Sequence, residues 1–224
     1  MTHQARAEST RRAILDAAVE VFHEAGYGNA SLTEIIDRAG VTKGACYYHF
    51  PTKAAVASAL IAESDAVIEE AICAVWHAAP LATNVMESLI RAAFVVADCA
   101  RFDNRIRIGF HLMIALGEGE AERSRYERQR AFLVEAVDRA ISEGDINTEV
   151  SASDLGYTLW VSLLGNHLLS EAVGEDLTAA LARLLRSILP GVCTARSRSF
   201  FLHFVDRLDS QYALTAAEQT GRTG

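Results

Sequence analysis

The sequence contains few of the residues that interrupt helices or form hairpins. Only three prolines occur, at positions 51, 80 and 190, so long helices are possible everywhere between them. Runs of β-branched and aromatic residues with a period of two are absent, as are the Asn-Gly and Asp-Gly pairs of tight hairpins. Half of the 224 residues are hydrophobic, which is ample for a core. These features predict an all-α fold.

Cysteine and histidine are also scarce and scattered, and long apolar runs are missing. The four cysteines form no C-x-x-C pair and no secreted-type framework, and the histidines do not cluster with them. No stretch approaches the ~18 consecutive apolar residues of a membrane span, and the N-terminus lacks the apolar core of a signal peptide. We therefore expect a cytoplasmic protein with no metal site, no cofactor and no membrane partner.

Residues 31–53 have the pattern of two short helices joined by a tight turn. They read S-L-T-E-I-I-D-R-A-G-V-T-K-G-A-C-Y-Y-H-F-P-T-K. Ser31 and Glu34 form a capping box, which predicts a helix start, and Gly40 suits the sharp turn after that helix. Thr42 can cap the second helix, and a proline ends it. Such a pair is typical of the helix-turn-helix, whose second helix enters the DNA major groove.

The charge distribution fits a small DNA-facing head on an acidic body. The net charge of −8 opposes DNA binding if the chain is taken as a whole, because phosphate repels an acidic surface. Residues 1–53, however, contain six basic and six acidic residues, so the remaining 171 residues carry the full −8. Lys43 and Lys53, the only lysines of the chain, both lie in the suspected DNA-reading segment.

Hydrophobic periodicity and helix-breaking residues predict about ten helices. We expect residues 1–53 to form the helix-turn-helix DNA-binding domain, residues 54–212 a ligand-binding and dimerisation domain, and residues 213–224 a flexible tail. The predicted helices span approximately residues 5–25, 31–39, 42–50, 52–79, 83–101, 103–116, 120–143, 153–172, 176–189 and 198–212.

Two segments carry a resemblance to a known family. They are R-R-A-I-L-D-A-A-V-E-V-F-H-E-A-G-Y, which begins at Arg11, and the helix-turn-helix segment 31–53. Together they resemble the TetR family of bacterial repressors, and G-V-T-K-G-A-x-Y-x-H-F resembles its γ-butyrolactone-receptor branch. The resemblance implies a homodimer that binds palindromic operator DNA, from which a small-molecule inducer entering the body releases it. It also suggests control of secondary metabolism.

The resemblance implies DNA contacts for several residues of the motif. Lys43 matches a position that contacts a base or a phosphate, since a lysine can reach guanine O6 and N7. Tyr47 and His49 match positions that bind the DNA backbone, and Lys53 can neutralise a phosphate at the start of the next helix. The complete set of predicted DNA-binding residues is Ser31, Thr33, Thr42, Lys43, Gly44, Ala45, Tyr47, His49 and Lys53.

The remaining residues of the second helix have other predicted roles. Gly44 and Ala45 have almost no side chain, so they allow the helix to approach the groove closely. Cys46, Tyr48 and Phe50 are expected to pack in the core of the head.

Ligand-binding residues are sought on the helices of the body, as polar groups on otherwise apolar faces. Thr158, Ser162 and Asn166 recur every four residues and form one polar line on an apolar helix. The same face could instead serve close helix packing in a dimer. The resemblance places an aromatic residue, usually Trp, where this chain has Tyr126, and a phenol there suits a butenolide or a furan carboxylate. The predicted ligand-binding residues are Tyr126, Thr158, Ser162, Trp76 and Phe110.

The dimer is expected to be a four-helix bundle made of the eighth and ninth helices of two subunits. An enzyme is disfavoured because G-x-S-x-G, H-E-x-x-H and phosphate-loop motifs are absent. The main alternative is a pseudo-receptor that binds DNA but senses antibiotics or other hydrophobic compounds, or nothing. The apolar rows expected to form the dimer are Leu159, Leu163, Leu177, Leu181, Leu184 and Ile188.

Overall fold

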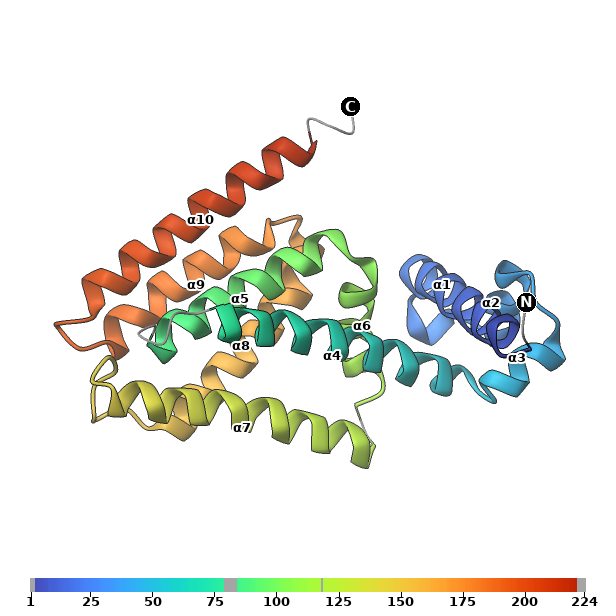
Figure 1. Ribbon diagram of the computed structural model, residues 1–224, viewed down its shortest axis with the longest axis horizontal. Coiled ribbons are helices and arrows are strands. Elements are labelled where there is room, and N and C mark those ends of the chain that lie inside the picture. The colour runs from blue at the N-terminus through green and yellow to red at the C-terminus, as the bar shows by residue number, and fades with distance from the viewer. Residues whose placement is uncertain (1–2, 79–83, 118, 221–224) are drawn as a thin grey trace. The chain divides into compact units, whose positions relative to one another are not determined.

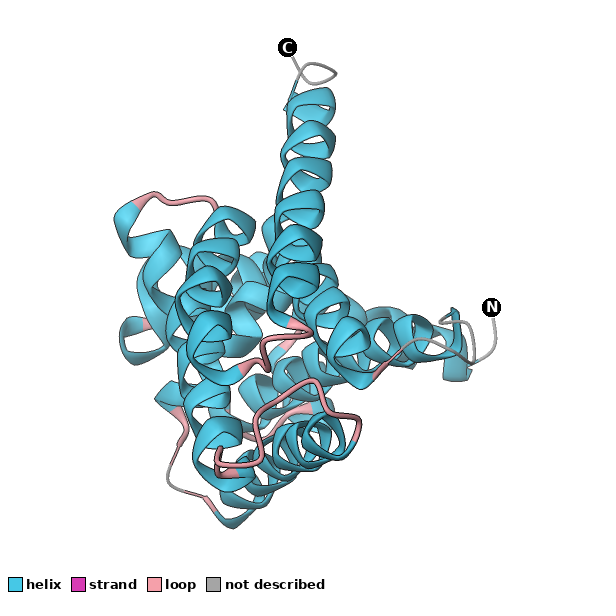
Figure 2. Ribbon diagram, turned by 90° about the vertical axis from the view of Figure 1, so that its left-hand side faces the viewer, coloured by secondary structure: helices cyan, strands magenta, loops and turns pink. Residues whose placement is uncertain are grey.

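The computed structural model describes residues 3–78, 84–117 and 119–220, and all regular elements within these ranges are helices (Figure 1 and Figure 2). The all-α prediction is confirmed. None of the described helices combines the length and apolar character needed to cross a membrane. The helices are α1 (His3–Asn29), α2 (Leu32–Ala39), α3 (Lys43–His49), α4 (Lys53–Ala78), α5 (Val85–Phe102), α6 (Asn104–Ala115), α7 (Glu120–Ser142), α8 (Ala152–Val173), α9 (Leu177–Val192) and α10 (Arg198–Thr220).

The chain forms two compact units, whose limits differ from the predicted boundary at residue 53. The first unit comprises Met1–Ile68 and Asp103–Glu122, and the second comprises Glu69–Phe102 and Arg123–Gly224. The first unit therefore contains α1 to α3, the first part of α4, and α6. Sequence order assigned α6 to the body, but its apolar side chains pack with α1. The functional roles assigned to the two domains stay predictions.

The core of the first unit explains why α6 belongs to it. Ile108 and Leu112 of α6 are buried in one apolar cluster with residues of α1, α2, α3 and α4. Arg105 of α6 also donates a 2.8 Å hydrogen bond to the carboxylate of Asp16 in α1. Helices α4 and α6 cross where Gly109 faces Ser64, and a Cβ added to Gly109 would lie 2.4 Å from the Ser64 hydroxyl oxygen.

The second unit is built around α9, which packs on α5, α8 and α10. Arg101 of α5 forms a 2.9 Å salt bridge with Asp176 and a 3.2 Å hydrogen bond with Thr178, at the start of α9. Phe94 of α5 stacks on Tyr212 of α10, with ring centroids 5.6 Å apart. These contacts join three helices that lie side by side in Figure 1.

Three helices end later than predicted. Helix α1 runs to Asn29, four residues beyond the predicted end, although its backbone is non-helical at Gly26, with φ 72° and ψ 156°. Helix α9 continues through Pro190 to Val192, because a proline in the last turn removes only one hydrogen bond there. Helix α10 continues to Thr220, eight residues beyond the predicted end at Tyr212. The predicted tail therefore begins as helix, and its last residues, 221–224, lie outside the described part of the chain.

Candidate nucleic-acid interface

The helix-turn-helix begins with the predicted capping box. The Ser31 amide donates to the Glu34 carboxylate at 2.8 Å, and the Glu34 amide donates back to the Ser31 hydroxyl at 3.2 Å. Hydrogen bonds from the side chain and the backbone of Ser31 lower the pKa of Glu34. Helix α2 ends at Gly40, whose φ of 64° lies in the left-handed region. Thr42 then caps α3 by accepting a 3.2 Å hydrogen bond from the Ala45 amide.

Helix α2 is also fixed to α1 by charge. Arg38 donates two hydrogen bonds to the carboxylate of Glu24, at 2.6 and 2.7 Å. The hydrogen bond from Arg38 is the main cause of the lowered pKa of Glu24. Two parallel hydrogen bonds define the orientation of α2 more closely than a single contact would.

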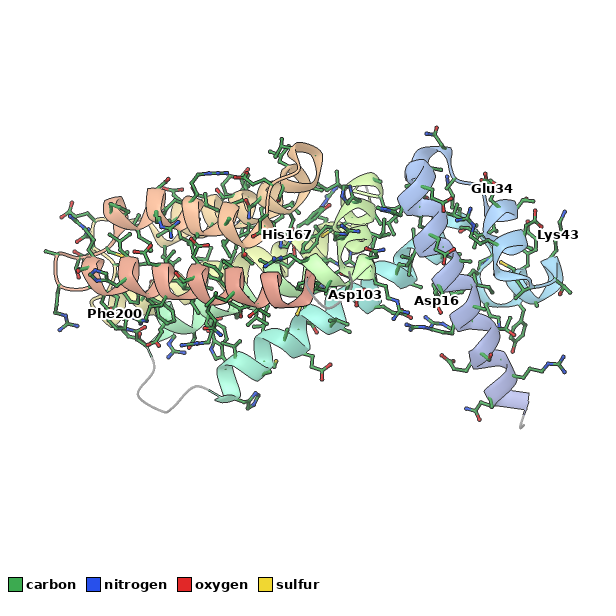
Figure 3. The ribbon with its side chains drawn as sticks, turned by 90° about the horizontal axis from the view of Figure 1, so that it is seen from above. Asp16, Glu34, Lys43, Asp103, His167 and Phe200 are labelled. Atoms are coloured by element: carbon green, nitrogen blue, oxygen red, sulfur yellow. The ribbon has the colours of Figure 1, made fainter. Side chains whose placement is uncertain are left out.

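Helix α3 presents a mixed basic and aromatic surface. The side chain of Lys43 is exposed, and Figure 3 shows it projecting from the edge of the first unit. Tyr47 is 53% exposed and Tyr48 is 77% exposed, while His49 is half-buried. Lysine and tyrosine side chains on such a surface can donate hydrogen bonds to bases and phosphates.

The prediction that Tyr48 packs in the core is wrong. Cys46 and Phe50 are buried as predicted, with 0% and 5% of their surfaces exposed. They lie one turn apart and occupy the inner face of α3, whereas Tyr48 is two residues, or about 200°, from each of them. Tyr48 therefore points outward, and its ring makes an edge contact with His49 at 5.1 Å. The helical spacing of Cys46, Tyr48 and Phe50 was the sequence signal that could have predicted the exposed position of Tyr48.

Gly44 leaves open space beside the first turn of α3. Among the described residues, a Cβ added at this position would meet no atom within 4 Å. Gly44 is exposed on the same side of α3 as Tyr48, which follows it by one turn. The other predicted small residue, Ala45, is half-buried. Two further predicted DNA-binding residues, Thr33 and Thr42, have exposed side chains.

Lys53 is the predicted DNA-binding residue with the most contacts inside the protein. Its ammonium donates to the backbone carbonyls of Tyr27 at 2.6 Å and of Ala30 at 2.7 Å, and lies 3.5 Å from that of Gly28. The same nitrogen lies 4.4 Å from the centre of the Tyr27 ring. The phosphate contact predicted for Lys53 stays a prediction.

The predicted ligand-binding residues lie on four helices, α4, α6, α7 and α8. Thr158 is exposed, and its hydroxyl donates to the Asp154 carbonyl of its own helix at 2.8 Å. Ser162 is half-buried on α8, and Trp76 of α4 contacts Phe132 with ring centroids 5.6 Å apart. Phe110 lies on α6 and so belongs to the first compact unit.

Among the predicted ligand-binding residues, Tyr126 lies beside a second aromatic side chain and an amide. Its ring meets Trp160 of α8 edge-on at 5.6 Å, and the Trp160 indole donates to Gln129 at 3.4 Å. The sequence interpretation did not select Gln129, although it lies one turn after Tyr126 on α7. Tyr126, Gln129 and Trp160 thus form an aromatic and amide cluster between α7 and α8.

The second unit also contains an apolar cavity of about 40 Å³. None of the predicted ligand-binding residues lines it. Its volume is close to that of one water molecule and well below that of an ordinary ligand pocket. The lining residues are Met86, Leu89, Ile90, Ala93, Leu133, Ile146, Leu155, Leu159, Leu163, Leu185, Ile188, Leu189 and Val192.

His167, on α8, has a pKa that burial lowers to about 4, from an ordinary value of 6.5. Removal from water disfavours the charged imidazolium, so the ring is neutral at pH 7. Across the described residues, no group of three His, Cys, Asp or Glu side chains is arranged to hold a metal ion.

The dimer surface predicted from apolar rows is partly wrong. Leu177 and Leu181 are 8% and 1% exposed within their own chain, so they leave almost no area for a partner. Helix α8 instead exposes an apolar row with a four-residue spacing, interrupted once by the small Gly165. The row consists of Tyr157, Val161, Leu169 and Val173, which are 51%, 43%, 64% and 68% exposed.

Comparison with known proteins agrees with this helix-turn-helix architecture. A model of the bacterial regulatory proteins of the tetR family matches residues 14–60. The chain is 33% identical over 197 residues to the A-factor receptor protein of Streptomyces griseus, an alignment covering 86% of this chain and 67% of that protein. It is 29% identical over 199 residues to the HTH-type transcriptional repressor BepR of Brucella suis biovar 1 (strain 1330), covering 83% and 93% of the two chains.

Solved structures show the same fold. A gamma-butyrolactone receptor described as an ArpA like protein matches with a TM-score of 0.78 and 24% identity, over 92% of this chain and 99% of that one. CprB from Streptomyces coelicolor, in complex with its operator sequence, matches with a TM-score of 0.76 and 25% identity, over the same shares of 92% and 99%. The chain therefore belongs to the TetR family of bacterial transcriptional regulators and is related to the γ-butyrolactone receptors.

Proposed function

We propose that this regulator is a homodimeric repressor that binds a palindromic operator and is released by a small signalling molecule. The signal we propose is a γ-butyrolactone, a butenolide or a furan derivative, and the regulated genes belong to secondary metabolism. The observation that carries the DNA-binding part is the exposed face of α3. Lys43 and the ring of Tyr48 are exposed on α3, and Gly44 places no side chain on the first turn of that helix.

This face suits the major groove for three physical reasons. Lys43 supplies a cation that reaches guanine O6 and N7 or a phosphate. The phenol of Tyr47 can donate to a phosphate oxygen, which fixes the helix in register without reading sequence. The ring of Tyr48 can contact a thymine methyl group, and Gly44 adds no atoms that would hold the helix away from the bases. Ser31, Thr33, Thr42, Ala45 and His49 remain proposed contacts around this face.

The homodimer follows from the need to cover the exposed apolar row of α8. Val161, Leu169 and Val173 expose apolar surface that a second α8 can bury in an isologous contact. Two helices of each subunit would then form a four-helix bundle, with α9 beside α8. A twofold axis in the body accounts for a palindromic operator, because each half-site is read by one head.

Two observations support the proposed class of signalling molecule: the proteins that this chain resembles and the cluster of Tyr126, Gln129 and Trp160. The A-factor receptor protein and the gamma-butyrolactone receptors are the named proteins that this chain resembles. Within the chain, Tyr126 and Trp160 provide aromatic surface beside the amide of Gln129. A planar lactone or furan ring can pack on such rings, and its carbonyl can accept a hydrogen bond from the phenol. Thr158 and Ser162 remain proposed contacts on α8, with Trp76 and Phe110 as proposed wall residues.

The direct test is binding of the purified protein to its own upstream DNA, measured by fluorescence anisotropy. The bound complex is then titrated with γ-butyrolactones, butenolides and furan carboxylates. Tight binding that depends on the palindrome and is reversed by one class supports the proposal and identifies the signal. Binding that none of them reverses favours a pseudo-receptor that senses other compounds. Absence of specific binding to that DNA rejects autoregulation.

A further inference from the structure

We infer that the twofold axis of the homodimer passes beside Gly165, where α8 of one subunit crosses α8 of the other in an antiparallel arrangement. This inference deepens the proposed homodimer and rests on it. It adds the residue at the centre of the contact and the direction of the partner helix. The argument starts from the apolar row of α8, in which Gly165 is the central position.

The apolar row is symmetric about Gly165. Val161 and Leu169 lie four residues before and after it, and Tyr157 and Val173 lie eight residues before and after it. These four side chains are between 43% and 68% exposed. An isologous contact requires a surface that is complementary to itself. An antiparallel crossing at the central residue meets this requirement, because it places each half of the row against the other half in the partner.

Gly165 leaves room for a second helix at the centre of the row. Among the described residues, no atom lies within 4 Å of a Cβ added at this position. Glycine weakens a helix interior relative to alanine, and in return it allows another backbone to approach closely. The described part of the chain supplies no such backbone at Gly165, whereas a second α8 that crosses here would occupy the open space.

The exposed face of α8 also lacks formal charge around Gly165. Residues 155–170 include no Asp, Glu, Lys or Arg. Two polar side chains close to Gly165 bond within their own chain: the Asn166 amide donates to the Leu177 carbonyl at 3.3 Å, and the Ser170 hydroxyl donates to the Asn166 carbonyl. A helix face in contact with water usually carries charged residues, whereas the core of a protein interface is depleted of them. The composition of this face therefore favours a protein partner over solvent.

The antiparallel crossing predicts distances that cysteine substitution can test. Packed helix axes lie about 8–10 Å apart and each Cα lies about 2.3 Å from its axis, so the two Gly165 Cα atoms should be about 5 Å apart. A disulfide spans Cα–Cα distances of about 4.4–6.8 Å. The two copies of Val161 should be about 12 Å apart, because each lies about 6 Å from the crossing, on opposite sides of it.

The first test is oxidative crosslinking of Gly165→Cys. It uses a background of Cys73→Ser and Cys99→Ser, which removes the two native thiols that are not buried. On oxidation, Gly165→Cys should form a covalent dimer on a non-reducing gel, and Val161→Cys, the matched control, should form little. Crosslinking of Val161→Cys that equals or exceeds that of Gly165→Cys would overturn the inference.

The second test enlarges the residue at the proposed crossing. Gly165→Leu should fold, because the space beside Gly165 is open within its own chain, and circular dichroism checks this. It should raise the dissociation constant of the dimer at least about a hundredfold, because two leucines collide at the axis. Gly44→Leu, at an open helical glycine of α3, is the matched control and should leave that constant unchanged. Analytical ultracentrifugation measures both, and a Gly165→Leu protein that dimerises as tightly as the parent contradicts the crossing.

The outcomes separate this inference from the proposed function. An unaltered protein that stays monomeric at micromolar concentration rejects both the proposed homodimer and the position of its axis. A dimer in which Gly165→Cys does not crosslink rejects only the axis at Gly165. All these measurements are made without DNA, so failure to bind the operator would reject the proposed repressor function while the crosslinking result still stands. The crosslinking result also decides the matter if Gly165→Leu does not fold.

Discussion

Gly109 of α6 lies so close to Ser64 of α4 that no side chain fits between the two helices. A Cβ on Gly109 would approach both the Cβ and the hydroxyl oxygen of Ser64 to 2.4 Å. This contact, together with buried Ile108 and Leu112, makes α6 part of the core of the head. The head is therefore a five-helix assembly whose last member comes from much later in the chain.

The first prediction concerns this contact. Gly109→Ala should destabilise the protein by about 1–3 kcal/mol through overpacking, although alanine favours helix over glycine by about 1 kcal/mol. Urea unfolding measures the change. Gly44→Ala is the matched control, because Gly44 is also helical, a Cβ there meets nothing within 4 Å, and the substitution should be neutral or stabilising. The added substitution Ser64→Gly should recover most of the loss; equal unfolding free energies for Gly109→Ala and the parent would contradict the packing argument.

The second prediction separates the two neighbouring aromatic residues of α3. Tyr48→Ala should change the free energy of unfolding by less than about 0.5 kcal/mol, because its ring is 77% exposed, while it weakens operator binding. Phe50→Ala should cost about 3–5 kcal/mol of stability, because its ring is buried. Thermal or urea unfolding and operator anisotropy test both. Unaltered operator affinity in a folded Tyr48→Ala protein would remove Tyr48 from the interface.

The third prediction is that Gly44→Ala raises the stability of the protein and lowers its affinity for the operator. Gly44→Ala should stabilise the protein by up to about 1 kcal/mol, since the position is helical and open. The added methyl group should weaken operator binding, because it stands between α3 and the bases. The two quantities are measured on one sample by urea unfolding and anisotropy. A variant that is more stable and binds equally well would show that α3 does not approach the groove closely at this residue.

The fourth prediction concerns Lys43. Lys43→Ala should cost about 1–3 kcal/mol of operator affinity if the lysine reads a base, with the loss concentrated on the matching sequence. A loss of the same size on operator and unrelated DNA would identify a phosphate contact instead. Competition anisotropy with both DNAs at fixed salt distinguishes these outcomes, and no loss on either would exclude Lys43 from the interface.

The fifth prediction is a pH dependence from His167. Its pKa of about 4 in the folded protein lies below the ordinary 6.5, so the unfolded chain binds more protons between these values. The stability contributed by the neutral ring is complete above pH 6.5 and should fall, by at most about 3 kcal/mol, as the pH drops towards 4. Urea unfolding from pH 7.5 to 4 tests this. His167→Gln should show a shallower decline, and identical profiles would contradict the role of His167.

Local rules predicted the helix-turn-helix well because its signals are contained within a few residues. The Ser31 capping box, the Gly40 turn and the Thr42 cap are interactions over three to five positions, and all are found. The outward position of Tyr48 was also available from helical spacing, but the general tendency of aromatic rings to be buried was given more weight. That preference was incorrect for a short helix with only one inner face.

The contacts of Lys53 and the place of α6 could not be predicted in the same way. Lys53 meets carbonyls more than twenty positions earlier, and backbone carbonyls are present at every residue, so no sequence pattern marks them. Membership of α6 in the head depends on tertiary packing between residues about ninety positions apart, such as Asp16 and Arg105. For the ligand site, the exposed position of Thr158 shows that a polar line on a helix does not reveal whether it faces inward.

The placement of α6 has a consequence for protein engineering. A chimaera that exchanged residues 1–53 for the DNA-reading part of another regulator would divide a single hydrophobic core between two parents. Ile108 and Leu112 of the recipient would then face side chains selected against a different helix. A functional graft should carry Asp103–Glu122 together with Met1–Ile68, so that operator specificity is transferred as two separate stretches of sequence.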